Sequence, residues 1–340
     1  MKTWQDAQRL LDDKPWSAHL YVTDQCNLDC HYCNEYDNSK PHPDTEDLKR
    51  YMRKIRELGV IHLGFQGGEP LLHPDICELV RYARSLGFIR VSMSTNAFKL
   101  TEELLRGLEK AGLTSMQFSV DRMTPIKSTR KSLKTVLHKV PWFDHSPIRL
   151  NVAGVLFKDS VGETDEVIAA CLERDIDVAA RVIHDDLIND RQLRDPEAIQ
   201  DLLGALDRQS TNKARGDKIH TSWNLLDYQK KMLRGEDSEW SCVAGYKYFF
   251  VSAEGKFWLC SQVRTDVDIM DVTPELLKSY DTPKDCQTGC GVYCIADMSL
   301  AVSHPGRYLA REISGIATSK LSLARRRGVA RAKRAMGQPA

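Results

Sequence analysis

Short β-rich segments alternate with amphipathic helical segments from residue 17 to about residue 210, and this alternation restricts the fold more than any other feature of the sequence. The β-rich segments are 17–23, 61–66, 89–95, 115–120, 148–157 and 177–183. Apolar residues at i, i+3, i+4 and i+7 predict helices at 45–58, 75–86, 101–111, 129–140 and 164–175. Repeated βα units predict a parallel sheet or a barrel with its site at the carboxyl ends of the strands.

The pattern changes after residue 195. Segments 195–209 and 222–235 have helical spacing, 247–260 predicts a hairpin that turns at Glu254-Gly255, and 274–280 predicts a short helix before a cysteine-rich loop. We therefore predict an α/β fold with a small C-terminal α+β domain. The predicted parts are an N-terminal helix (1–14), a core (15–215), a linker helix with the C-terminal domain (216–300) and a basic tail (301–340).

Ten cysteines are unusual in a chain of 340 residues. The sequence has no apolar run of roughly 18 residues and no secretory signal, so we predict a cytoplasmic location. In a reducing cytosol, clustered cysteines more often bind metal than form disulfides. The net charge of +1 combines a strongly basic end with an acidic body. No nucleic-acid or membrane partner is predicted, and the role of the tail stays open.

The first cysteine cluster follows the first predicted strand directly. Cys26, Cys30 and Cys33 form a C-x3-C-x2-C motif. Three thiolates on one loop can hold three corners of a four-iron cluster and leave one iron without a protein ligand. Such an open position is what metal catalysis requires. A zinc site with His31 as the fourth ligand is the alternative, although the spacing is unlike common finger patterns.

The motifs that follow resemble those of the radical S-adenosylmethionine (radical SAM) superfamily. Tyr32 precedes the last cysteine, and the next three predicted strands are followed by Gly67-Gly68-Glu69-Pro70, Ser94-Thr95-Asn96 and Ser119-Val120-Asp121. These stretches are similar to the family's GGEP, S-T-N and S-x-D motifs and occur in the same order. Ala97 departs from the family, in which Gly often follows the Asn. The resemblance covers residues 17 to about 185 and implies a partial (β/α)6 TIM-like barrel.

The resemblance also implies the cofactors. A [4Fe-4S] cluster on the three cysteines would bind S-adenosyl-L-methionine (SAM) through its open iron. Reductive cleavage of SAM would give a 5′-deoxyadenosyl radical that abstracts a hydrogen atom from the substrate, with reduced flavodoxin or a ferredoxin-type protein as electron donor. Gly67 and Gly68 are expected to let the backbone approach the ligand. The implied cofactor-binding residues are Tyr32, Gly67, Gly68, Glu69, Ser94, Asn96, Ser119 and Asn151.

A second group of cysteines lies near the C-terminus. Cys242 and Cys260 bracket the predicted hairpin, and Cys286, Cys290 and Cys294 follow at C-x3-C-x3-C spacing. The segment from Cys242 to Cys260 resembles the start of the SPASM/twitch extension of the superfamily. We predict one auxiliary [4Fe-4S] cluster with four of these cysteines as ligands and Cys286 as the spare. A zinc knuckle made by the same residues is the alternative.

Two residues are candidates for catalysis. Asp121 and His184 both follow predicted strands at the catalytic edge. His184 could take a proton from a substrate radical. The alternatives are that Asp121 caps a loop and that His184 belongs to a solvated loop.

Three functions fit these motifs. The main prediction is a radical SAM oxidoreductase or lyase that dehydrogenates, epimerises or decarboxylates a small molecule such as a sugar, aminocyclitol or nucleoside. The second is a maturase that forms thioether or carbon–carbon crosslinks in a ribosomal peptide. Only 25 residues precede Cys26, too few for the fused peptide-recognition domain of many maturases, and this favours the first. The third is a non-catalytic metal-binding module. It is disfavoured because such a module would not need the GGEP-like and S-T-N-like motifs in the loops where they occur.

Overall fold

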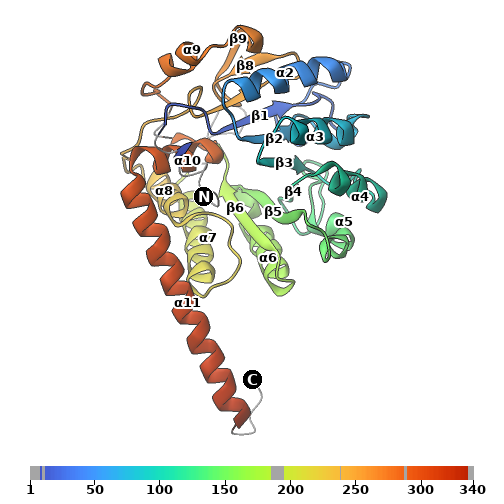
Figure 1. Ribbon diagram of the computed structural model, residues 1–340. Helices are drawn as coiled ribbons and strands as arrows, with labels where there is room; N and C mark the ends of the chain where they lie inside the picture. The colour runs from blue at the N-terminus through green and yellow to red at the C-terminus, as the bar shows by residue number, and fades with distance from the viewer. Residues whose placement is uncertain (1–7, 10–11, 185–194, 238, 287–288, 336–340) are drawn as a thin grey trace.

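The computed structural model describes residues 8–9, 12–184, 195–237, 239–286 and 289–335, with side chains described as far as residue 320 (Figure 1). One nine-stranded sheet, in the order β6-β5-β4-β3-β2-β1-β7-β8-β9, organises these residues. The strands are β1 (Ser17–Tyr21), β2 (His62–Gln66), β3 (Arg90–Thr95), β4 (Ser115–Ser119), β5 (Arg149–Leu156), β6 (Asp177–Val182), β7 (Tyr248–Val251), β8 (Lys256–Trp258) and β9 (Arg264–Asp268). Strands β1 to β6 are parallel, as the alternating pattern predicts.

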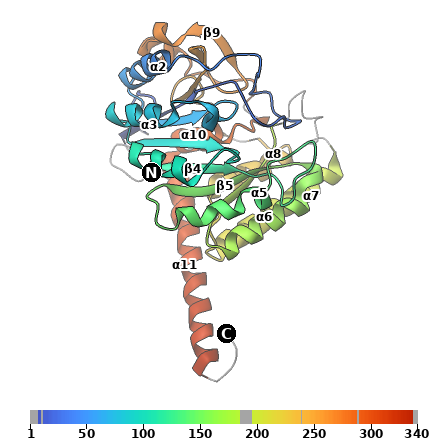
Figure 2. The same ribbon diagram turned by 90° about the vertical axis from the view of Figure 1, so that its right-hand side faces the viewer.

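The helices that connect the parallel strands cover one side of the sheet (Figures 1 and 2). They are α2 (Thr45–Glu57), α3 (Ile76–Ser85), α4 (Glu102–Ala111), α5 (Leu133–Val136) and α6 (Val161–Glu173). In α2, the Asp44 side chain caps the first turn by accepting from the Glu46 amide, and the apolar face is buried. Gly59, Gly87 and Gly112 have positive φ after α2, α3 and α4, which confirms their predicted place at helix ends.

One connecting helix is shorter than the sequence predicts. The apolar spacing predicts a helix over 129–140, but α5 begins at Leu133 and continues as the 3-10 segment Leu137–Phe143. The preceding residues form a loop that is closed by two hydrogen bonds, from the Asp121 amide to the Lys131 carbonyl and from the Leu133 amide to the Arg122 carbonyl. This loop carries Lys131 back to the carboxyl end of β4.

The C-terminal part continues the same sheet. The hairpin predicted at 247–260 is present as β7 and β8, but β7 pairs in parallel with β1, and β9 was not predicted. The predicted small C-terminal domain is therefore not a separate sheet, because β7 uses the hydrogen-bonding edge that β1 would otherwise leave open. The predicted N-terminal helix 1–14 falls mostly outside the described residues.

The remaining helices are α7 (Pro196–Ala214), α8 (Trp223–Leu233), α9 (Pro274–Ser279), α10 (Tyr293–Ser303) and α11 (Pro305–Ala335). Helix α11 starts beside α8 and α10 and then projects from the body (Figures 1 and 2). Within the described part of the chain, no helix is both long and apolar enough to span a membrane.

Candidate active site

Glu69 joins three of the motifs at the carboxyl ends of β1, β2 and β3. Its side chain is 1% exposed, and it accepts hydrogen bonds from the Thr95 hydroxyl (2.5 Å) and from the Asn96 amide (2.7 Å). The Asn96 side-chain amide in turn donates to Asn27, inside the cysteine motif, at 2.9 Å. Burial raises the pKa of Glu69, and the hydrogen bonds from Thr95 and Asn96 oppose that shift. The chain thus fixes the GGEP-like, S-T-N-like and cysteine segments to one another.

Gly67 and Gly68 pack against the chain and not against an open space. A Cβ at Gly67 would lie 2.1 Å from the Thr23 carbonyl oxygen, and one at Gly68 would lie 2.2 Å from the Gln25 carbonyl oxygen. Gly67 also has φ of 132°, which side-chain-bearing residues rarely adopt. The close approach that these glycines permit within the protein is to the segment before Cys26, and their approach to a ligand stays a prediction. Their effect is to hold the cysteine loop at the end of β2.

The three-cysteine loop carries free thiols in a partly buried setting. Cys30 is buried, and Cys26 and Cys33 are partly exposed. Burial raises the pKa of all three thiols, that of Cys26 to about 11, while the Lys131 ammonium lowers them. Because a metal binds the thiolate, loading iron here releases protons.

Tyr32, Asp121 and Lys131 form a polar group against this loop. The Tyr32 hydroxyl donates to Asp121 Oδ2 at 2.5 Å, and Lys131 Nζ donates to the Tyr32 hydroxyl oxygen at 3.1 Å. The Val155 amide donates to Asp121 Oδ1, so both carboxylate oxygens have partners. Burial raises the pKa of Tyr32, and Asp121 adds to the shift. Lys131 lies within a predicted helix, so the sequence carried no signal for its role.

The donor set fits a cluster held by three thiolates. No three Cys, His, Asp or Glu side chains of the described residues are arranged around one point as ligands of a single ion. A four-iron cluster differs because each thiolate binds a separate iron. His31, the fourth ligand of the zinc alternative, has its Nδ1 within hydrogen-bond distance of the Ser128 carbonyl and of the Thr129 hydroxyl.

The C-terminal cysteines divide into four and one. Burial raises the pKa of the Cys290 thiol, and Cys242, Cys260 and Cys286 lie close enough to raise it further. The Cys294 thiol instead contacts the Tyr248 hydroxyl, and burial raises the pKa of this thiol to about 11. These contacts favour Cys294, and not the predicted Cys286, as the spare.

The other predicted residues lie in three places. His184 Nδ1 accepts a hydrogen bond from the Gly291 amide at 2.9 Å, so this side chain binds the cysteine-rich loop. Ser94 and Asn151 line the cavity inside the sheet. Asn151 is the third residue of β5 and therefore lies below the loops at the strand ends. Ser119 is the last residue of β4 and is partly exposed.

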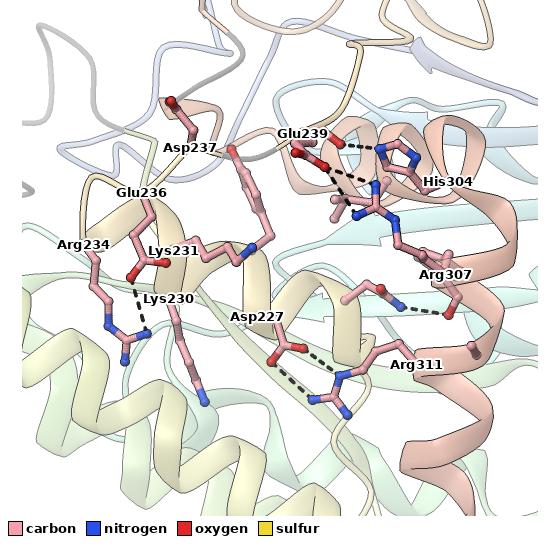
Figure 3. A pocket seen from close by; sticks show the side chains of 15 residues that line it. Asp227, Lys230, Lys231, Arg234, Glu236, Asp237, Glu239, His304, Arg307 and Arg311 are labelled. Carbon is pink, nitrogen blue, oxygen red and sulfur yellow. Dashed lines mark hydrogen bonds and ion pairs between the residues drawn. The ribbon is translucent and has the colours of Figure 1, made fainter.

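Two cavities are large enough for a ligand. One of about 790 Å³ is enclosed by the inner faces of the parallel strands and by α10 and α11. The other, of about 890 Å³, is a surface cleft between α8 and α11 (Figure 3). Its arginines are paired, as the contact of Arg311 with both oxygens of Asp227 illustrates. Of the motif residues, Ser94 is the one that lines the cavity between the strands, and Gln66 of the same lining directly precedes Gly67.

The structure is thus a parallel α/β sheet with three free thiols in the loop after its first strand, and three thiols on one loop are suited to hold a metal cluster. Residues 20–143 match the family model of the Radical SAM superfamily, so this part of the chain is a radical SAM domain, as the motifs predicted.

Relatives with assigned activities cover this region. The chain is 28% identical over 171 residues to PqqA peptide cyclase of Bradyrhizobium diazoefficiens (48% of this chain, 45% of the relative). It is 29% identical over 181 residues to PqqA peptide cyclase of Rhizobium meliloti (50% and 48%). In each case the match spans about half the length of the relative.

Solved structures share the fold over most of the chain. Streptococcus suis SuiB bound to its precursor peptide SuiA has a TM-score of 0.62 at 17% identity, with 86% of this chain and 73% of that chain covered. The anSMEcpe structure with bound AdoMet and a peptide has a TM-score of 0.59 at 16% identity, with 87% and 99% covered.

Proposed function

We propose that this chain is a radical SAM enzyme that modifies a peptide. The observation that carries the proposal is the Glu69 junction, which fixes the GGEP-like and S-T-N-like segments to a loop with three free thiols. Four-thiolate sites are closed, whereas three thiolates leave one metal position for an external ligand. When bound, the cluster and SAM supply one-electron cleavage of SAM and removal of a hydrogen atom from the substrate.

The residues of this chain would bind and orient these groups. Cys26, Cys30 and Cys33 would hold the cluster, and Lys131 would offset part of the negative charge of their thiolates. Asp121 is a candidate for contact with the substrate because it lies beside this loop, but its hydrogen bond from Tyr32 makes it equally a positioning residue. His184 is better suited to position the cysteine-rich loop than to move a proton.

The same proposal assigns an auxiliary [4Fe-4S] cluster. Its ligands would be Cys242, Cys260, Cys286 and Cys290, whose thiols influence one another. With all four irons bound by cysteine, this cluster would not bind SAM but could accept an electron. Lys284 would stabilise the loop through its hydrogen bonds to the Cys242 and Thr282 carbonyls.

The comparisons favour the peptide alternative over the small molecule that the short N-terminal segment suggested. The PqqA peptide cyclases act on a peptide by name, and SuiB and anSMEcpe were solved with peptides bound. The length of chain before Cys26 is a weak argument because a recognition domain can be a separate protein. The electron donor and the cytoplasmic location stay predictions.

Anaerobic reconstitution with iron and sulfide tests the proposal. We expect about eight irons per chain, and 5′-deoxyadenosine on reduction in the presence of SAM. Short peptides encoded near the gene, added to the reduced enzyme, should include one whose mass falls by two hydrogen atoms, as crosslink formation requires. Iron-replete protein that forms no 5′-deoxyadenosine would contradict radical SAM chemistry. Turnover of a small molecule with no peptide product would restore the first hypothesis.

A further inference from the structure

The cavity between the parallel strands contains two guanidinium groups that pair with none of the described residues. Arg181 lies near the end of β6, and Arg90 lies at the start of β3. Neither guanidinium makes an ion pair or a hydrogen bond with any described residue, and Arg181 Nε is buried. A buried charge without a counter-charge is costly, so such groups are normally paired. The cavity therefore has an unmet requirement for negative charge.

The acidic side chains of the cavity do not meet this requirement. Asp297 accepts hydrogen bonds from the hydroxyls of Ser222 and Tyr308, and Glu312 accepts from Asn224. Burial lowers the pKa of Arg181, and Asp297 opposes this without forming an ion pair. The nearest carboxylates are thus held on other partners, and both arginines stay available.

Neutral polar side chains complete the wall of the cavity. Gln117 on β4 pairs in register with Ser94 on β3 and with Asn151 on β5, and all three line the cavity. Asn151 Oδ1 and His19 Nδ1 are both buried, and neither has a hydrogen-bond partner in the described part of the chain. Orphaned buried acceptors and donors of this kind are rare in folded proteins. Side-chain amides and hydroxyls are suited to bind the amide groups of a peptide backbone.

An apolar stripe on α11 borders the same cavity. Leu309, Ile313 and Ile316 line it and are 38%, 65% and 52% exposed. Exposed large apolar side chains beside a polar cavity are typical of a binding surface. A ligand that reaches Arg181 past this stripe would carry apolar groups next to its charge.

We propose that this cavity binds a peptide through a carboxylate that pairs with Arg181, with neighbouring apolar side chains of the peptide on the α11 stripe. This inference rests on the proposed function and specifies its substrate class: a peptide with an acidic group flanked by apolar residues. A guanidinium binds a carboxylate through two parallel hydrogen bonds, which explains why an arginine occupies this position.

Chemical labelling of the reconstituted holoenzyme tests the pairing without relying on turnover. Phenylglyoxal modifies accessible guanidinium groups, and mass spectrometry follows Arg181 and, as an internal control, Arg311 of the surface cleft (Figure 3). The probes are two blocked tripeptides, leucyl-glutamyl-leucine and its glutamine counterpart, each added with SAM. We expect the glutamyl peptide to slow labelling of Arg181 at least about fivefold more than the glutaminyl peptide, with no change at Arg311.

Two further arms identify the source of the carboxylate. One arm compares the glutaminyl peptide with a free C-terminal carboxylate against the same peptide in its blocked form. If only the peptide with the free carboxylate protects Arg181, the carboxylate that pairs with Arg181 is that of a peptide C-terminus, and the pairing is supported. SAM has a carboxylate of its own, so full protection by SAM without peptide would overturn the proposal. Equal protection by the blocked glutamyl and glutaminyl peptides would also overturn it.

Binding to variants gives a second measurement. Arg181→Met should weaken binding of the glutamyl peptide at least about tenfold and leave the weak binding of the glutaminyl peptide unchanged. Arg181→Lys should recover part of the affinity because the charge is kept but the paired geometry is lost. Arg311→Met is the matched control and should leave the affinities for the glutamyl and glutaminyl peptides unchanged. Unchanged affinity in Arg181→Met with normal 5′-deoxyadenosine formation would refute the peptide contact and leave the radical SAM assignment intact.

Discussion

The loop after β1 and the cysteine-rich C-terminal segment both gather free thiols near one lysine, but they differ in the number of thiols. The β1 loop has three, close to Lys131, and Lys131 is hydrogen bonded to Tyr32 at the mouth of the barrel. The C-terminal segment brings four together beside Lys284, which binds backbone carbonyls of the same segment. Under the proposed assignment, the same side-chain chemistry gives an open metal site in one place and a closed one in the other.

The largest effect is expected from removing a thiol of the open site. Cys30→Ala should abolish reductive SAM cleavage and lower the iron content from about eight to about four per chain, because one cluster loses a third of its protein ligands. Iron analysis and a 5′-deoxyadenosine assay check this. Cys171→Ala, at a buried cysteine of α6, is the control and should retain the full iron content and normal SAM cleavage. Normal SAM cleavage by Cys30→Ala would show that the β1 loop is not the open metal site, and the proposed difference between the two regions would then be wrong.

Removing a thiol of the closed site should separate SAM cleavage from product formation. Cys290→Ala is expected to lose about four irons and all peptide product while 5′-deoxyadenosine still forms. Cys294→Ala is the matched variant four residues away and should keep all its iron, because its thiol contacts Tyr248. Iron loss in Cys294→Ala together with full iron in Cys286→Ala would reverse the assignment of the spare cysteine.

A smaller effect is expected at the junction that supports the open site. Glu69→Gln would place an amide group where the carboxylate accepts from Thr95 and Asn96, and one buried donor would lose its partner. We expect a loss of about 1–3 kcal/mol in the free energy of unfolding and about tenfold weaker SAM binding. Denaturant titration and equilibrium dialysis measure these. Glu254→Gln, at an exposed pair with Lys40, should cost less than about 1 kcal/mol.

The smallest effect concerns the pairing of β1 with β7, the strands that precede the two regions. His19 on β1 contacts the Tyr248 hydroxyl on β7, and burial lowers its pKa from 6.5 to about 4. The unfolded chain therefore binds the proton first as the pH falls below 6.5, and stability decreases until about pH 4. Between pH 7.5 and 5.5 the expected loss from this residue is about 1 kcal/mol. Denaturant titrations at both pH values should show a smaller decrease in His19→Gln than in the unaltered protein.

Most of the barrel follows from local sequence. The parallel strands β1 to β6 and the helix-ending glycines were predicted because apolar periodicity and positive-φ positions leave local signals. The loop at 121–132 was not predicted, since its hydrogen bonds join Asp121 and Arg122 to residues inside a segment with helical spacing. The pairing of β7 with β1 was equally hidden, because strand partners more than two hundred residues apart leave no local pattern.

The sequence by itself determined the chemistry of the thiol loop and the order of the motifs, because these depend on residue types at fixed short spacings. Ala97 illustrates the limit: it has a φ of 63° at a position where the family often has Gly, a fact that only the backbone reveals. The tertiary structure decided which C-terminal thiols lie near one another and that Arg181 faces a cavity without forming an ion pair with a described residue. Burial and charge pairing depend on neighbours supplied by distant segments, and these neighbours exist only once the chain has folded.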